Sequence, residues 1–160
     1  MIEVEIEDLA WSRDLPDAEH RATVAAQAAL KAGGAAPDAV VTVLLSSDDD
    51  VAELNQRFRH KSGPTNVLSF PAPETARPQL GDLALAHGVC VREASEQAKP
   101  LADHLSHLVA HGALHLLGWD HRTDDEAEAM EALERQVLAA LGIPDPYAPR
   151  CESDADRRPQ

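Results

Sequence analysis

Alternating apolar and polar residues mark the strands of this chain. Residues 2–7, IEVEIE, alternate strictly, which is typical of a strand with one buried face. Residues 40–45, VVTVLL, are apolar and mostly β-branched, which predicts a central strand. Shorter apolar runs at 66–70 and 81–86 predict two more strands. The pattern therefore indicates a small sheet of about four strands.

Helical periodicity fills the segments between and after these strands. Helices are predicted over 17–32, from a cap at Ser46 or Ser47 to about Phe58, over 88–98, from Leu101 to Gly118, and over 124–141. Pro16 is expected at the first helical position of the first of these helices, and a capping box at Thr123 and Glu126 begins the last. This order predicts an α+β fold: a single domain over residues 1–143, with a small mixed sheet packed against about five helices. Residues 144–160 are polar and contain proline, which predicts a disordered tail.

Four of the eight histidines lie in one predicted helix, at positions 104, 107, 111 and 115. Steps of three and four residues keep them within an arc of about 80° on the helix surface. For His104 and His107 we prefer a hydrogen-bonded role in the core, because single histidines on such a face are more often core residues than ligands.

Residues 111–121, HGALHLLGWDH, contain a metal-binding pattern. His111 and His115 are one helical turn apart, and Gly118 allows the tight turn that brings His121 back toward them. Three imidazoles suit one Zn²⁺ per chain and leave a coordination position for water, as in catalytic zinc sites. The spacing equals that of metzincin peptidases, but Gly112 replaces their catalytic glutamate, which disfavours a peptidase.

Composition limits the partners of this protein. Its 28 acidic and 14 basic residues give a net charge of −14, which argues against a protein that coats nucleic acid. The local exception is the segment 57–61, with Arg57, Arg59, His60 and Lys61. These cations are compatible with the stabilisation of a helix end, and equally with an anion site in which Arg59 and Lys61 contact phosphate. The acids, including six in 124–134, are expected to lie away from that site.

Location is predicted from the absence of targeting signals. The acidic N-terminus is not a signal peptide, and the longest apolar stretch is too short to span a bilayer. Cys90 and Cys151 lie far apart and do not suggest a disulfide framework. We therefore expect a cytoplasmic protein without a membrane partner.

Two segments resemble the signature motifs of the YbeY family of bacterial metal-dependent endoribonucleases. Residues 54–71, LNQRFRHKSGPTNVLSFP, are similar to L-N-x-x-[FY]-R-x-K-D-x-P-T-D-V-L-S-F-P, and residues 107–121, HLVAHGALHLLGWDH, to H-L-x-V-H-G-x-L-H-L-x-G-[YF]-D-H. GDLALA at 81–86 matches the strand between them, and the resemblance covers about residues 2–142. Ser62 and Asn66 stand where the family pattern has acids, and Trp119 where it usually has tyrosine.

The resemblance implies a single-strand-specific zinc endoribonuclease that processes the 3′ end of 16S ribosomal RNA in ribosome maturation and quality control. The implied partners are the ribosomal RNA precursor and the small ribosomal subunit with its proteins. It also implies that His111, His115 and His121 bind the zinc and that Arg59 acts in catalysis. Lys61 is expected to bind the substrate.

Several alternatives are compatible with these residues. Asp120 is interpreted either as a hydrogen-bonding partner of a ligand imidazole or as a helix-flanking cap. Water and the 2′-hydroxyl of RNA are both possible nucleophiles.

The alternative function is a non-catalytic, metal-stabilised ribosome-assembly factor, and a zinc peptidase is less favoured. The negative charge predicts weak binding of free RNA, so the substrate should be reached through the ribosome or a protein partner.

Overall fold

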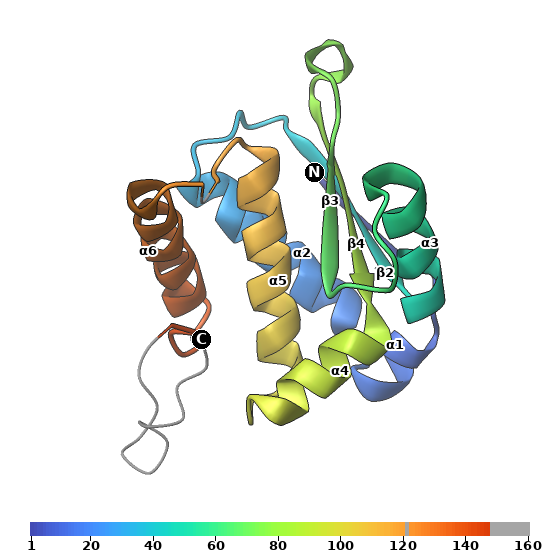
Figure 1. The fold of residues 1–160 in the computed structure, drawn as a ribbon. Coiled ribbons are helices and arrows are strands. Elements are labelled where there is room, and N and C mark those ends of the chain that lie inside the picture. Colours follow the sequence, from blue (N-terminus) through green and yellow to red (C-terminus); the bar gives the residue numbers. More distant parts are fainter. Residues whose placement is uncertain (121, 148–160) are drawn as a thin grey trace.

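A four-stranded mixed sheet forms the centre of the protein in the computed structural model, which describes residues 1–120 and 122–147 (Figure 1). The strand order is β1-β2-β4-β3. Strands β1 (Ile2–Ile6), β2 (Val40–Ser46) and β4 (Gln79–Ala86) are parallel, and β3 (Val67–Pro71) pairs antiparallel with β4 at the edge of the sheet. All four predicted strands are confirmed.

The described residues form six α-helices and one short 3₁₀ helix, η1 (Glu74–Ala76). The α-helices are α1 (Ala10–Asp14), α2 (Ala18–Ala32), α3 (Asp48–Arg59), α4 (His87–Glu96), α5 (Leu101–Leu116) and α6 (Asp124–Ala140). The predicted caps are present, because the hydroxyl of Ser47 accepts from the Asp50 amide and that of Thr123 from the Glu126 amide. The predicted α+β fold is therefore confirmed.

Helix α1 is one element that the sequence pattern missed. It has only five residues, too few to show a helical period. Trp11 anchors it, since this side chain is fully buried and its indole N–H donates to the carbonyl of Ser46 on β2. Pro16 lies in the turn between α1 and α2 rather than at a first helical position, so that detail of the prediction is wrong.

The helices cover the sheet on both faces. Helices α2 and α5 pack on one face, α6 packs outside them, and α3 packs on the other face (Figure 1). The main core, which includes Leu83 of β4 and Leu114 of α5, lies between the sheet and α2 and α5. A smaller core lies beneath α3 and contains Val51, Leu68, Ala84 and Ala86. On its face of the sheet, α5 contacts β4 and the edge strand β3.

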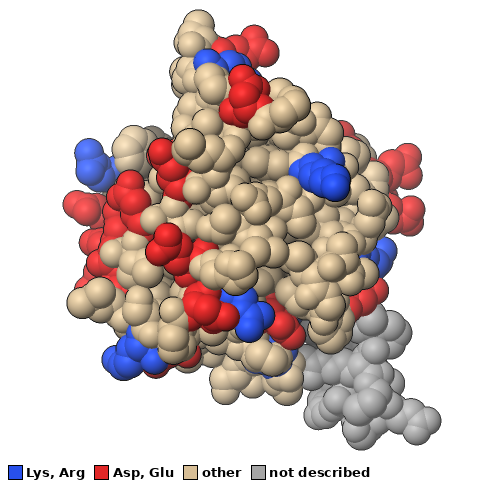
Figure 2. Space-filling model, turned by 180° about the vertical axis from the view of Figure 1, so that it is seen from behind, with Lys and Arg blue, Asp and Glu red and all other residues tan. Residues whose placement is uncertain are grey.

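Acidic side chains spread over the back of the molecule (Figure 2). They gather on the side of α3, whose first turn carries Asp48, Asp49 and Asp50. Within the two described ranges, no helix combines the length and apolar character needed to cross a membrane.

Candidate active site

A groove of about 810 Å³ lies between α5 and the segment from the end of α3 to β3. Five of the six predicted site residues line it: Arg59, Lys61, His111, His115 and Asp120. The sixth, His121, lies outside the described residues. The fold therefore brings together two sequence segments that are about fifty residues apart, and the groove has the size of a small-ligand or nucleotide site.

Two of the predicted zinc ligands converge in this groove. The Nε2 atoms of His111 and His115 lie 3.1 Å apart, and the His111 ring is partly accessible. Two nitrogens that bind one tetrahedral zinc at about 2.0–2.1 Å are about 3.3 Å apart, so the pair fits a shared ion. The described residues contain no group of three His, Cys, Asp or Glu side chains that could hold a metal ion. The third ligand that the sequence predicts is His121, which lies outside these residues.

A buried carboxylate supports this histidine pair. Glu134 of α6 is fully buried, and its Oε2 lies 2.7 Å from Nδ1 of His111. Its Oε1 lies 2.9 Å from Nε2 of His107 and accepts a hydrogen bond of 2.6 Å from the Tyr147 hydroxyl. Burial raises the pKa of the Glu134 carboxyl, but hydrogen bonds from His107, His111 and Tyr147 outweigh burial and hold that pKa at about 2. The carboxylate is therefore ionised, which suits a partner of a metal-binding imidazole.

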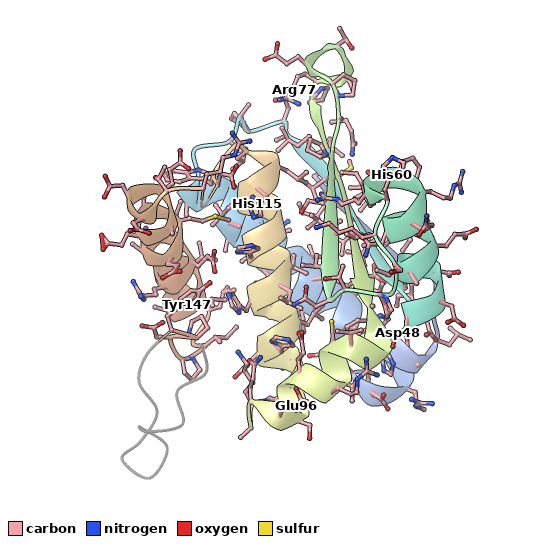
Figure 3. All side chains as sticks on the ribbon, in the orientation of Figure 1. Asp48, His60, Arg77, Glu96, His115 and Tyr147 are labelled. Carbon is pink, nitrogen blue, oxygen red and sulfur yellow. The ribbon has the colours of Figure 1, made fainter. Side chains whose placement is uncertain are left out.

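Glu134 and Tyr147 are site residues that the sequence analysis missed. The expectation that the acids of 124–134 lie away from the site is wrong for Glu134. A signal was present, because its neighbours at helical spacing, Met130, Val137 and Leu138, are apolar core residues. An acid on the apolar face of a helix needs a partner inside the fold. Tyr147 belongs to the predicted tail, of which only 144–147 are described (Figure 3).

The two remaining histidines of α5 both contact carboxylates, as expected for hydrogen-bonded residues. His104 is buried, and its Nε2 lies 2.8 Å from Oε1 of Glu93 on α4. The same Glu93 oxygen accepts a hydrogen bond from the side-chain amide of Asn66. Asn66 thus has a defined structural role although the family pattern has an acid there. His107 contacts Glu134 and lines the groove.

Arg59 and Lys61 are held at the opposite wall of the groove. The guanidinium of Arg59 donates from Nη2 to the carbonyl of Ser69 on β3 at 2.9 Å. The side chain of Asn55 donates to the Gly63 carbonyl, and its backbone carbonyl accepts from the Lys61 amide. The αL conformation of His60 ends α3 and turns the chain into this loop (Figure 3). Both cations line the groove, which supports an anion site over a purely helix-capping role.

Charge in the groove is opposite to the charge of the whole chain. In the described part of the chain, the Lys, Arg, Asp and Glu residues that line it are three cations, Arg59, Lys61 and Arg122, and one acid, Asp120. Asp120 forms an ion pair of 2.8 Å with Arg122. The predicted contact of Asp120 with a ligand imidazole stays a prediction. A positive groove on an acidic protein suits a small number of phosphate contacts.

Comparison with known proteins agrees with this geometry. The sequence model of the family described as "Endoribonuclease YbeY" matches residues 4–142. A protein from Maricaulis maris named Endoribonuclease YbeY is 52% identical over 146 residues, which are 91% of each chain. One of the same name from Azorhizobium caulinodans is 52% identical and covers 92% of this chain and 96% of its own.

A solved structure is also similar. The solution structure of TM1509 from Thermotoga maritima matches with a TM-score of 0.56 and 25% identity, and the match covers 92% of this chain and 99% of that one. The family match spans both walls of the groove, with Arg59 and Lys61 on one side and the paired histidines on the other. The chain therefore belongs to the YbeY endoribonuclease family.

Proposed function

We propose that this protein is a zinc-dependent endoribonuclease that cleaves single-stranded RNA in the groove between α5 and β3. One observation carries the proposal: the two imidazole Nε2 atoms, 3.1 Å apart, share a groove with Arg59 and Lys61. Membership of a family of endoribonucleases makes RNA the substrate class that suits this combination of imidazoles and cations.

The substrate that we propose is the 3′ end of the 16S ribosomal RNA precursor, bound with the small ribosomal subunit and its proteins in the cytoplasm. The charge distribution supports delivery by a partner, because the chain carries −14 overall and its groove is lined by three cations. Trp119 also lines the groove, and an aromatic side chain there suits stacking with an unpaired base. Bases in a duplex have no free face for such stacking.

In this proposal His111, His115 and His121 hold one zinc ion. Bound zinc supplies a Lewis acid for a phosphoryl oxygen and lowers the pKa of water. Arg59 stabilises the negative charge that develops on the phosphate as it is attacked. The guanidinium of Arg59 has five N–H donors, and because the carbonyl of Ser69 accepts from one of them, others can face the phosphate. Lys61 binds a neighbouring phosphate as a point charge. Asp120, beside His121 in the sequence, orients a ligand imidazole or holds Arg122.

Cleavage of a 16S 3′-end precursor fragment by the purified full-length protein tests this function. His111→Ala and Arg59→Ala should each lower the rate about 100-fold or more. His20→Ala and Arg57→Ala are matched controls, since His20 is exposed on α2 and Arg57 of α3 stacks on Phe58 instead of lining the groove. The same fragment annealed into a duplex should resist cleavage.

The outcomes separate the candidate functions. Cleavage that survives both substitutions would come from a contaminant and would contradict the proposal. A folded, zinc-loaded protein without any cleavage would indicate a non-catalytic assembly factor instead. A 2′,3′-cyclic phosphate on the product would identify the 2′-hydroxyl as the nucleophile, and a free 3′-hydroxyl on the 5′ fragment would identify water.

A further inference from the structure

Glu134 is a fully buried carboxylate at the back of the histidine pair. We infer that Glu134 is a positioning residue: clamped by Tyr147 and His107, it orients His111 so that the Nε2 of this imidazole faces the metal. The inference rests on the proposed function, because it assumes that His111 binds zinc. It adds two residues, Glu134 and Tyr147, to the machinery that makes the site.

Hydrogen bonding at Glu134 determines which nitrogen of His111 carries a proton. The carboxylate of Glu134 accepts a hydrogen bond from the Tyr147 hydroxyl at Oε1, and with Oε2 as the acceptor of the 2.7 Å contact the proton lies on Nδ1 of His111. In the neutral ring the lone pair is then on Nε2. That atom is the one that lies 3.1 Å from Nε2 of His115. The carboxylate thus selects the tautomer in which His111 is a metal ligand.

Tyr147 and His107 fix the carboxylate itself. The Tyr147 hydroxyl lies 2.6 Å from Oε1 of Glu134, and Nε2 of His107 lies 2.9 Å from the same oxygen. Oε2 therefore remains available to His111. The carboxylate is fully buried and therefore cannot rotate without breaking these hydrogen bonds. A ligand imidazole held by such a rigid partner loses little freedom when it binds metal.

The segment after α6 holds Tyr147 in place. Asp145 accepts a hydrogen bond from the Tyr147 amide at 2.8 Å and forms an ion pair of 3.1 Å with Arg135. The guanidinium of Arg135 also lies 5.4 Å from the centre of the Tyr147 ring. A chain of contacts thus leads from the surface of α6 through Tyr147 and Glu134 to His111.

A merely structural role of Glu134 would be to tie α6 to α5. An apolar side chain would serve that purpose at lower cost, because a buried carboxylate has to be compensated by its partners. All the hydrogen bonds described for Glu134 come from two imidazoles and a phenol, and none from a lysine or arginine. A divalent cation on His111 would add the missing positive charge.

Zinc affinity, measured by competition with a chromophoric chelator, tests the inference. Glu134→Gln should lower the affinity about 10- to 100-fold, as for other partners of metal-binding histidines. Tyr147→Phe removes only the clamp, and a loss of about 2- to 12-fold is expected. Glu128→Gln, an exposed position on the same helix, should leave the affinity unchanged.

A second measurement does not depend on any variant. Long-range ¹H–¹⁵N NMR of the metal-free wild-type protein at pH 8 should show His111 as the Nδ1–H tautomer. An Nε2–H tautomer would overturn the inference, as would a Glu134→Gln protein that binds zinc like the wild type. If Glu134→Gln does not fold, Tyr147→Phe and the wild-type spectrum decide. A wild type that binds no zinc would instead contradict the proposed function.

Discussion

Gly112 of α5 faces the side chain of Leu83 on β4 so closely that a Cβ atom at position 112 would lie 2.7 Å from Leu83 Cδ2. Position 112 thus faces the sheet, whereas His111 and His115 face the groove. A side chain at position 112 would collide with Leu83 at its first atom. The missing glutamate of the peptidase pattern is therefore a consequence of packing, and the structure supports the view that the site does not use that general base.

Gly112→Ala should destabilise the protein by about 1 kcal/mol. Overpacking of a core costs about 1–3 kcal/mol, and the higher helix propensity of alanine recovers up to about 1 kcal/mol. Urea unfolding followed by circular dichroism measures the change. In a double-mutant cycle, Leu83→Val should cost less in the Gly112→Ala background than in the wild type. Additive costs would show that the two side chains do not compete for space.

Asn55→Ala should lower RNA cleavage without loss of zinc. Asn55 is buried, and its side chain ties the Gly63 carbonyl to α3, which holds the loop that follows Arg59 and contains Lys61. Loss of this bond should cost about 1–3 kcal/mol of stability and misplace the cations that we propose to bind phosphate. Cleavage rate and zinc content should be measured on one preparation. Gln56→Ala, exposed on the same helix, is the control, and an unchanged rate in Asn55→Ala would contradict the role of the loop.

His104 should make the protein less stable as the pH falls below 6.5. Burial lowers the pKa of His104 from its ordinary 6.5, assisted by Lys99 and His107, while the hydrogen bond to Glu93 opposes the shift. Within the described part of the chain, its Nδ1 is buried without a hydrogen-bonding partner, so protonation would create an N–H without an acceptor. Between the folded pKa and 6.5 the unfolded chain binds more protons, which makes the free energy of unfolding rise with pH.

This pH dependence can be assigned by substitution. The free energy of unfolding of the wild type should decrease from pH 7 to pH 5, and His104→Gln should decrease less over the same range. The exposed His20→Gln is the matched control and should follow the wild type. Parallel curves for wild type and His104→Gln would exclude His104 as the source of the slope.

Zinc should stabilise the folded protein, and a chelator should remove that stabilisation. Free zinc at 100 times its Kd adds about 2.7 kcal/mol, because the folded state alone assembles the site. For a domain of this size the gain corresponds to roughly 5–11 °C in Tm. His111→Ala should melt at the same temperature with and without zinc. An equal zinc-dependent shift in that variant would place the metal elsewhere.

Binding of free single-stranded RNA should be weak and only mildly salt-dependent. Three cations line the groove, and each phosphate contact contributes about −0.7 to the slope of log K against log salt for single strands, so the slope should be about −2. Fluorescence anisotropy over a salt series measures it. Arg59→Ala should reduce the magnitude of the slope by about 0.7, while Arg57→Ala should leave it unchanged. A much steeper slope would indicate an RNA surface beyond the groove.

Local sequence was enough to predict the secondary structure and part of the site. The alternation in 2–7 predicted β1, since the side-chain period of a strand is two, and the β-branched apolar run at 40–45 predicted β2. His111 and His115 were placed together by the helical repeat alone, and the structure brings their Nε2 atoms to 3.1 Å. The short helix α1 was not predicted, because five residues are too few to show a helical period.

Contacts between distant segments decided the rest. The side chain that supports His111 is Glu134, 23 residues further along the chain, and not one of its own helix. Arg59 reaches the groove because β3 pairs antiparallel with β4 at the edge of the sheet, beside α5. Sequence by itself thus determined the pair of imidazoles, whose separation is a property of one helix. The tertiary structure alone decided which carboxylate, which phenol and which cations meet that pair, because those contacts depend on how separate helices and strands pack.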